Sequence, residues 1–282
     1  MADNSGISWT HHTWNPWYGC DKVDPGCAHC YIHRSLIKLG KEPWGEIYRA
    51  KTTWGDPIKW QKNAQAAGHA VRAFTCSLSD FFHVKADPWR DEAWKIIGLT
   101  PNITWLILTK RPSLIASRLP ADWFDGYPNV WLGTSVCHRA AYKNMDILRS
   151  IPCAVRWISA EPLLEDMSDI NLGGFGWVVA GGESGSGQEY LWDPEADWHE
   201  ELKHTAGRRT MKLEWARKMR DITKTAGLPF MFKQVTSANP GVGVNALGRV
   251  WHEYPDVSIP WKPQPKIEAK HLYTIEQIAA LP

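Results

Sequence analysis

Short apolar segments recur along the chain from residue 71 onward, and stretches of helical periodicity separate them. Six of these segments predict strands, at residues 71–76, 103–108, 129–136, 155–160, 176–180 and 229–232. Asp87-Pro88 predicts the start of an intervening helix, because aspartate caps helices and proline suits the first helical position. Strands that alternate with helices in this way indicate a parallel sheet built from βα units.

The residues before position 71 extend this pattern. A strand is expected at about residues 5–14, and a helix is expected at about residues 28–39, which Gly40 would end. The resulting total of about seven units predicts an α/β fold, specifically a partial or distorted (β/α) barrel. A doubly wound open sheet is the alternative arrangement of the same units.

Polar residues follow nearly every apolar segment at its carboxyl end. In a parallel barrel these ends meet at one mouth, where active sites lie. The residues expected to face a shared cavity are Lys110, Arg111, Ser135, Glu161, Glu183, Lys233 and Gln234. The simpler alternative is that strands end in polar residues because turns follow them.

Three cysteines lie close together near the N-terminus, with the spacing C-x6-C-x2-C at Cys20, Cys27 and Cys30. Pro25-Gly26 forces a turn inside this loop, and the last two cysteines are expected to open a helix and share one face. Three thiolates suit an iron–sulfur cluster with one open iron. The alternatives are unligated thiols or a zinc site completed by a nearby histidine, from the set His11, His12, His29 and His33.

The overall charge excludes a polycation. The 282 residues carry a formal net charge of +2, so nucleic acid could bind only through a local basic patch. Eight Lys or Arg residues lie between positions 203 and 224, and most of them suit a solvated helix face. Arg208 and Arg209 precede that helix near the expected mouth and are, with Lys110 and Arg111, candidates for phosphate contacts.

The sequence also contains a glycine-rich strand end, an expected insertion and a C-terminal tail. Gly181-Gly182-Glu183 ends a predicted strand, where glycines allow a backbone to approach a ligand closely. Residues 186–207 are interpreted as an insertion or lid within a barrel of residues 1–257. Residues 258–282 are expected to form a proline-rich tail, in which Thr274 begins a short helix. No apolar segment near 18 residues and no secretory signal is present, which predicts a cytoplasmic protein without a membrane span.

Several longer motifs resemble the phage-associated three-cysteine radical-SAM-like proteins. Besides the cysteine loop, the resemblance rests on LTKRP at 108–112, NVWLGTSV at 129–136, RWISAEPLL at 156–164, WVVAGGESG at 177–185 and FMFKQ at 230–234. It covers residues from about 5 to about 255. Two features depart from related enzymes: the first cysteine gap is longer than the usual C-x3-C-x2-C, and the segment 186–207 is longer than is typical.

The resemblance implies a barrel of radical-SAM type, with a [4Fe-4S] cluster and S-adenosylmethionine (SAM) as cofactors. Some phage members act as isomerases in thymidine hypermodification and convert an N-linked glycyl group on the thymine methyl carbon into the C-linked form. The implied substrate is phage DNA carrying modified thymidine, protected in this way from host restriction. An electron donor such as flavodoxin or ferredoxin and a location in the host cytoplasm follow from the same resemblance.

Residue roles follow on the same basis. Cys20, Cys27 and Cys30 would be the iron ligands, and SAM would contact Gly182, Glu183 and Ser135, with Ser79 and Asp80 as weaker candidates. Lys110, Glu161 and Lys233 are the candidate catalytic residues, and Arg111, Arg208 and Arg209 are the candidate DNA contacts. Two other functions remain open: a radical-SAM lyase that repairs DNA, and a zinc-stabilised nucleic-acid-binding protein.

Overall fold

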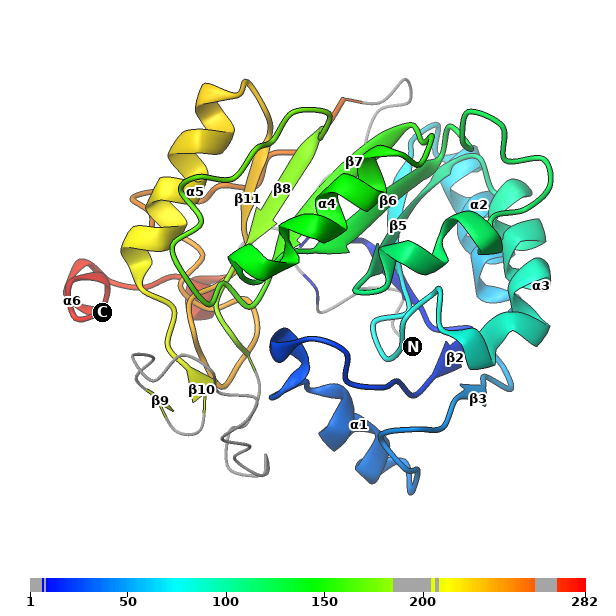
Figure 1. The fold of residues 1–282 in the computed structure, drawn as a ribbon, viewed down its shortest axis with the longest axis horizontal. Helices are drawn as coiled ribbons and strands as arrows, with labels where there is room; N and C mark the ends of the chain where they lie inside the picture. Colours follow the sequence, from blue (N-terminus) through cyan, green and yellow to red (C-terminus); the bar gives the residue numbers. More distant parts are fainter. Residues whose placement is uncertain (1–6, 8, 185–203, 206–207, 257–267) are drawn as a thin grey trace.

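The computed structural model describes residues 7, 9–184, 204–205, 208–256 and 268–282. Its main sheet has seven parallel strands in the order β1-β4-β5-β6-β7-β8-β11. The strands are β1 (His12–Trp14), β4 (Val71–Thr75), β5 (Ile103–Thr109), β6 (Val130–Ser135), β7 (Val155–Ala160), β8 (Trp177–Ala180) and β11 (Phe230–Phe232). Because the order never reverses, the predicted partial barrel is confirmed over the doubly wound alternative, and the sheet forms an open, curled half-barrel (Figure 1).

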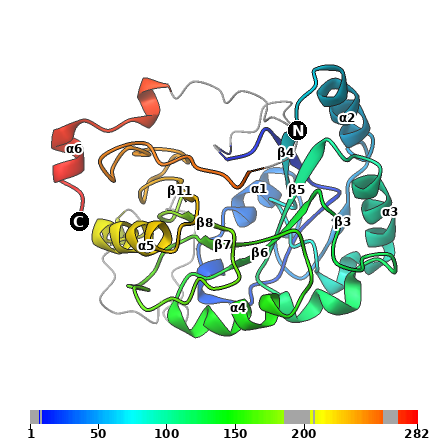
Figure 2. The ribbon, with the colours of Figure 1, turned by 90° about the horizontal axis from the view of Figure 1, so that it is seen from above.

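Helices cover the convex face of this half-barrel. They are α2 (Asp56–Ala66), α3 (Asp87–Gly98), α4 (Tyr142–Arg149) and α5 (Leu213–Thr225), and Figure 2 shows them around the outside of the curled sheet. The start of α3 at Asp87-Pro88 is confirmed. The connections β5–β6 and β7–β8 contain no α-helix; the first has only the 3-10 turns η3 (Pro112–Leu114) and η4 (Ala116–Arg118). Prolines at 112, 120 and 128 prevent a continuous helix there.

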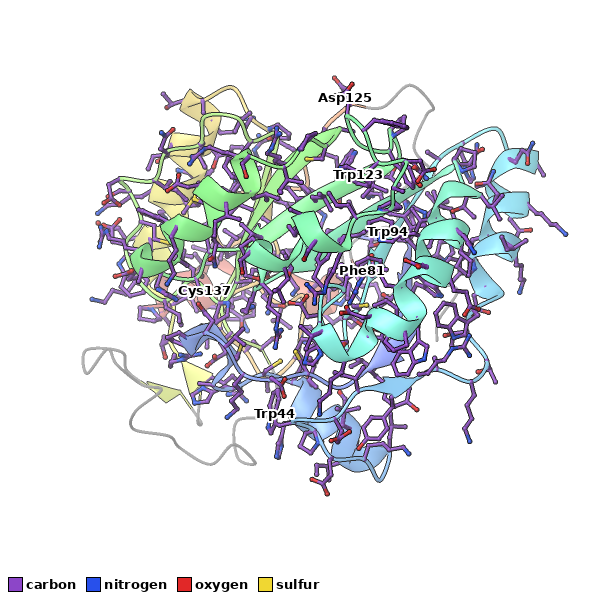
Figure 3. The ribbon with its side chains drawn as sticks, turned by 45° about the vertical axis from the view of Figure 1, so that its right-hand side comes forward. Trp44, Phe81, Trp94, Trp123, Asp125 and Cys137 are labelled. Carbon is purple, nitrogen blue, oxygen red and sulfur yellow. The ribbon has the colours of Figure 1, made fainter. Side chains whose placement is uncertain are left out.

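Aromatic side chains fill the layer between the sheet and α3. Phe81 packs edge-on against Trp94 with ring centroids 4.9 Å apart, and Trp94 contacts Trp123 at 5.4 Å (Figure 3). These three residues come from three separate segments of the chain, and each is 5% exposed or less. Their packing fixes the position of the loop after β4, which carries several residues of the cavity described below.

Tryptophans also fill the concave face of the half-barrel. Trp9, Trp157 and Trp177 contact one another with centroid distances of 5.3–6.1 Å, and Trp131 contacts Trp177 at 6.0 Å. A Cβ at Gly133 would lie 2.3 Å from the Trp157 ring, so glycine is needed where that ring crosses β6. The tryptophans thus pack the barrel interior, and the polar cavity is confined to the carboxyl ends of the strands.

The cysteine loop forms before α1 (Ile32–Lys38), which starts later than the expected helix at 28–39. Cys27 ends the 3-10 turn η1 (Pro25–Cys27), and Cys30 precedes α1. The expectation that both cysteines lie on one helix is therefore wrong, because Asp24 caps and Pro25 starts a separate 3-10 turn. The first strand of the sheet is also shorter than expected, and it is followed by β2 (Trp17–Tyr18), which pairs with β3 (Tyr48–Arg49).

The C-terminal segment packs on the barrel. The short helix predicted to begin at Thr274 is confirmed as α6 (Ile275–Ala279), and Thr274 and Gln277 form a capping box at its start. The backbone N–H of Leu213 donates to the Pro282 carbonyl, and residues 251–253 pair antiparallel with the outer edge of β11. Of the expected insertion 186–207, only β9 (His204–Thr205) lies among the described residues; it pairs with β10 (Arg208–Arg209). Among the described helices, none has the length and apolarity needed to cross a membrane.

Candidate functional site

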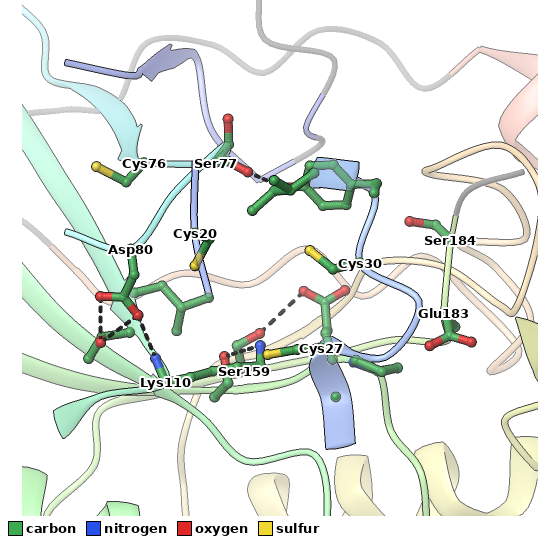
Figure 4. Close-up of a pocket in the computed structure, with 18 of the residues that line it drawn as sticks. Cys20, Cys27, Cys30, Cys76, Ser77, Asp80, Lys110, Ser159, Glu183 and Ser184 are labelled. Carbon is green, nitrogen blue, oxygen red and sulfur yellow. Dashed lines mark hydrogen bonds between the residues drawn. The ribbon is translucent and has the colours of Figure 1, made fainter. Parts of the chain in front are cut away.

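A cavity lies at the carboxyl ends of the parallel strands, between the strand ends and the cysteine loop (Figure 4). All seven polar residues expected at a shared mouth line it, so that expectation is confirmed. Apolar residues from the barrel interior, including Trp9, Phe74 and Leu108, also line it. The lining also includes Cys20, Cys27, Cys30, Ser79, Asp80, Ser159 and Gly182.

The three cysteine thiols face this cavity and are all free. Burial and the nearby Asp80 carboxylate raise the pKa of Cys20 to about 11, although Arg111 opposes the shift. Burial and Cys27 raise the pKa of Cys30 to about 12. The thiols of Cys20 and Cys30 are therefore neutral at pH 7, and a metal centre would have to displace their protons.

The chemistry of this donor set fits an iron–sulfur cluster, although the thiols are not gathered around one point. Within the described ranges, no three His, Cys, Asp or Glu side chains lie close enough together to hold a metal ion. Arg111 Nη1 lies 3.6 Å from Cys20 Sγ, and the amino group of Lys110 interacts electrostatically with Cys27 and Cys30. Cations beside three thiols are suited to compensate the negative charge of a thiolate-ligated cluster.

Three histidine–carboxylate pairs anchor the cysteine loop. Asp21 accepts a 2.8 Å hydrogen bond from His83 Nε2, which carries the proton because His83 Nδ1 accepts from the Lys85 backbone N–H. His83 caps η2 (Val84–Ala86), in the connection after β4. Asp24 accepts from His138 Nε2, also at 2.8 Å, at the start of η5 (Arg139–Ala141) after β6. These pairs fix the loop to two strand ends.

The third pair joins His29, between Cys27 and Cys30, to Glu183 after β8. His29 Nδ1 lies 2.8 Å from Glu183 Oε2, and both side chains are at most 4% exposed. Arg209 Nη2 lies 2.6 Å from Glu183 Oε1, and its Nη1 donates to the Pro25 carbonyl at 2.9 Å. Arg209 therefore ties the turn of the cysteine loop to the end of β8.

These contacts change the interpretation of the arginines. Arg209 is 2% exposed and Arg208 is 6% exposed, so neither presents its charge to a DNA backbone on the described surface. Arg111 contacts the Asp80 carboxylate at 3.3 Å and the Asp21 carbonyl at 3.0 Å, besides Cys20. The structure places Arg111 and Arg209 in the support of the cysteine loop, and it does not place Arg208 or Arg209 in the cavity lining.

The glycines after β8 approach other parts of the chain rather than an open space. A Cβ at Gly182 would lie 2.4 Å from the Thr236 backbone nitrogen. A Cβ at Gly181 would lie 2.7 Å from Glu161 Oε1. Gly182 also exchanges hydrogen bonds with Gln234, at 3.0 and 2.9 Å. The two glycines therefore allow β8 and β11 to end side by side, while Gly182 also lines the cavity, where its predicted approach to a ligand stays a prediction.

Asp80 and Ser79 have structural partners. The Asp80 carboxylate accepts from the Thr109 hydroxyl at 2.8 Å and from the backbone N–H groups of Phe82 and Lys110. The Ser79 hydroxyl donates to the Gly19 carbonyl at 2.6 Å. Both residues line the cavity, and both connect the loop after β4 to its neighbours.

The remaining polar residues form an arc along the strand ends. Ser135 and Ser159 lie opposite each other in the register of β6 and β7. Lys110 Nζ donates to Ser135 Oγ at 3.0 Å on one side of this pair, and Ser159 lies 3.4 Å from Glu161 Oε2 on the other. Lys233 Nζ lies 3.3 Å from Glu161 Oε1. The arc thus offers a cation, two hydroxyls and an ion pair to a ligand in the cavity.

Residues 4–208 match the model of a family described as "Protein of unknown function (DUF5131)". The chain belongs to this family. No curated protein and no solved structure gives a significant match to the sequence. The description of the DUF5131 family assigns no activity.

In this DUF5131 protein, sequence reasoning missed the groups that hold the loop. Asp21 and Asp24 belong to the cysteine loop itself, and His83 and His138 follow β4 and β6. The sequence holds a signal for His138, because it follows Ser135 by three positions. It therefore lies just after the carboxyl end of a strand that is expected to face the mouth of the barrel. The sequence indicates His29 as a possible zinc ligand, and nothing in it indicates the contact of His29 with Glu183.

Proposed function

We propose that this protein is a radical-SAM isomerase that acts on hypermodified thymidine in phage DNA and converts the N-linked 5-glycyl form to the C-linked form. The observation that carries the proposal is that three cysteines of one loop line the same cavity as the polar ends of the parallel strands. That position, at the carboxyl mouth of a parallel half-barrel, is where this architecture places its active sites.

Cys20, Cys27 and Cys30 are the proposed ligands of a [4Fe-4S] cluster, and Ser135, Gly182 and Glu183 are the proposed neighbours of SAM. When bound, this pair of cofactors would supply one-electron cleavage of SAM and hence an organic radical that abstracts hydrogen. The contribution of Glu183 is indirect, because both its oxygens are bound by His29 and Arg209. It holds the segment between Cys27 and Cys30 against the end of β8.

The protein's own contribution is positioning and the exclusion of water. The apolar residues Trp9, Phe74 and Leu108 line the cavity, and buried tryptophans fill the barrel interior. Radical intermediates require such protection from side reactions. Lys110, Glu161 and Lys233 lie on the polar arc and are the proposed substrate contacts.

For a thymidine in DNA, the base must leave the stack to reach the cavity. Because Arg208 and Arg209 are buried, they are not proposed as DNA contacts. The proposed electron donor is a flavodoxin or a ferredoxin, and the proposed location is the host cytoplasm, where viral DNA would be protected from restriction.

Iron loading tests the proposal. The protein would be purified anaerobically, reconstituted with iron and sulfide, reduced with dithionite, and examined by EPR with and without SAM. We expect a [4Fe-4S]⁺ signal that changes on SAM addition, and its loss in Cys27→Ala. Cys153→Ala is the matched control, because Cys153 is a free cysteine that does not line the cavity. Stoichiometric zinc without a cluster signal would favour the zinc-stabilised binding protein instead.

The product distinguishes the isomerase from a repair lyase. Liquid chromatography with mass spectrometry of nucleosides from DNA that carries N-linked 5-glycyl-thymidine should show a product of unchanged mass and altered chromatographic retention time. Release of intact thymidine from irradiated DNA, with the modified DNA unchanged, would identify the lyase.

A further inference from the structure

Most charged side chains around the cavity have a partner of opposite charge. Arg111 lies 3.3 Å from Asp80, Lys233 lies 3.3 Å from Glu161, and Arg209 lies 2.6 Å from Glu183. Lys110 differs from these three. Among the described residues, no carboxylate oxygen lies within 4.0 Å of its amino group.

Within the part of the chain that the structure describes, the Lys110 amino group has one hydrogen-bond partner, the Ser135 hydroxyl, at 3.0 Å. Asp24 is close enough to interact electrostatically with Lys110. However, its carboxylate already accepts hydrogen bonds from His138 and from the Gly26 backbone N–H. An ammonium has three N–H donors, so Lys110 retains donor capacity toward the cavity.

The position of Ser135 makes this a two-point donor site. Because its oxygen accepts from Lys110, its own O–H is available to donate in another direction. Both residues line the cavity, at the ends of neighbouring strands β5 and β6. An ammonium beside a hydroxyl matches the two oxygens of a carboxylate, and a charged pair of this kind is strong where water is excluded.

We propose that Lys110 and Ser135 bind the carboxylate of the substrate's glycyl group, and so select thymidine that carries an amino acid over thymidine that carries an uncharged or purely cationic group. This inference rests on the proposed function, and it names the substrate feature that the cavity recognises. Ser135 is also a proposed neighbour of SAM, whose methionine part carries a carboxylate of its own, so the experiment below separates a substrate carboxylate from a SAM carboxylate at this site.

Equilibrium binding of two nucleosides provides the test. The probes are 5-(carboxymethylaminomethyl)-2′-deoxyuridine, which carries the N-linked glycyl group, and 5-(aminomethyl)-2′-deoxyuridine, which lacks the carboxylate. Calorimetry would measure both with the protein before and after cluster reconstitution. We expect the wild type to prefer the carboxylate at least tenfold, Lys110→Met to abolish that preference, and Lys110→Arg to retain part of it. Lys62→Met, on the exposed surface of α2, is the control that should change nothing.

The thermal midpoint of Lys110→Met should stay close to that of the wild type, because Asp24, the carboxylate that interacts with Lys110 electrostatically, keeps its hydrogen bonds from His138 and from the Gly26 backbone N–H. A wild-type preference that survives in Lys110→Met would overturn the inference. Loss of SAM affinity in Lys110→Met, with the nucleoside preference unchanged, would assign the carboxylate to SAM and also overturn it. Failure of the wild type to load iron would refute the proposed function. If the iron-free protein also showed no preference for the nucleoside that carries the carboxylate, this inference would be refuted as well.

Discussion

Replacing Glu183 with glutamine tests how the cysteine loop is held. The Glu183 side chain is 4% exposed, and it accepts hydrogen bonds from His29 and from the guanidinium and backbone N–H of Arg209. Burial alone would raise its pKa, but the bonds from His29 and Arg209 hold the pKa of Glu183 at about 2, below its ordinary value of 4.5. This difference of about 2.5 pH units, at about 1.4 kcal/mol per unit, corresponds to about 3 kcal/mol of stability at neutral pH.

We therefore expect Glu183→Gln to lower the free energy of unfolding by about 3 kcal/mol at pH 7, because it leaves Arg209 as a buried cation without its partner. The pKa of Glu183 is depressed in the folded state, so the stabilisation is present above pH 4.5 and is lost as the pH falls toward 2. The difference between wild type and variant should shrink accordingly to about 1 kcal/mol at pH 3. Urea denaturation from pH 7 down to pH 3 measures it.

The matched control is Glu92→Gln. Glu92 pairs with Arg49 at 2.7 Å, but the two side chains are 51% and 39% exposed. An exposed pair of this kind contributes less than about 1 kcal/mol. Equal losses from the two substitutions, or a loss at Glu183 that does not change with pH, would refute the argument that burial makes the Glu183 contacts strong.

Three further predictions concern the same region. Gly182→Ala should destabilise the fold by about 2 kcal/mol or more in thermal or urea unfolding, because its Cβ would lie 2.4 Å from the Thr236 nitrogen, whereas Gly55→Ala has open space and should be nearly neutral. His138→Phe removes a hydrogen bond to the charged Asp24, so iodoacetamide should label Cys27 about tenfold faster, as measured by mass spectrometry; an unchanged rate would show that this pair does not hold the loop. Chelation of bound metal should shift the thermal midpoint by only a few degrees, and unfolding on chelation would show that the metal holds the loop.

The fold was largely predictable because the sequence pattern is local. Each buried strand is a short apolar segment, and the boundaries of β7 agree with the expected 155–160. The prediction was wrong where a capping residue or a proline starts a different local structure from the one that the apolar pattern indicates. Asp24 and Pro25 start a separate 3-10 turn, so the helix expected from residue 28 begins at Ile32. Prolines likewise interrupt the connection after β5, which holds 3-10 turns and no α-helix.

The candidate site was predictable in its location and less so in its internal contacts. Parallel strands place their carboxyl ends together, so polar residues after separate strands meet without any knowledge of their partners. Pairing between side chains has no such rule. His29 and Glu183 are 154 positions apart, and His138 and Asp24 are 114 apart, so nothing near either residue in the sequence indicates its partner. Arg209 could be interpreted from sequence only as a free charge for this reason.

The pattern of contacts indicates what the cysteine loop does and does not require. In small zinc domains the metal supplies the folding energy, because few other contacts hold the ligands in place. Here Asp21, Asp24 and His29 each bind a different strand connection, and the Pro25 carbonyl binds Arg209. The loop is therefore positioned by protein contacts that use no cysteine. All three thiols face the cavity, so a cluster would bind to a loop that protein contacts already position, and its binding would add stability to the folded state without being needed to form the loop.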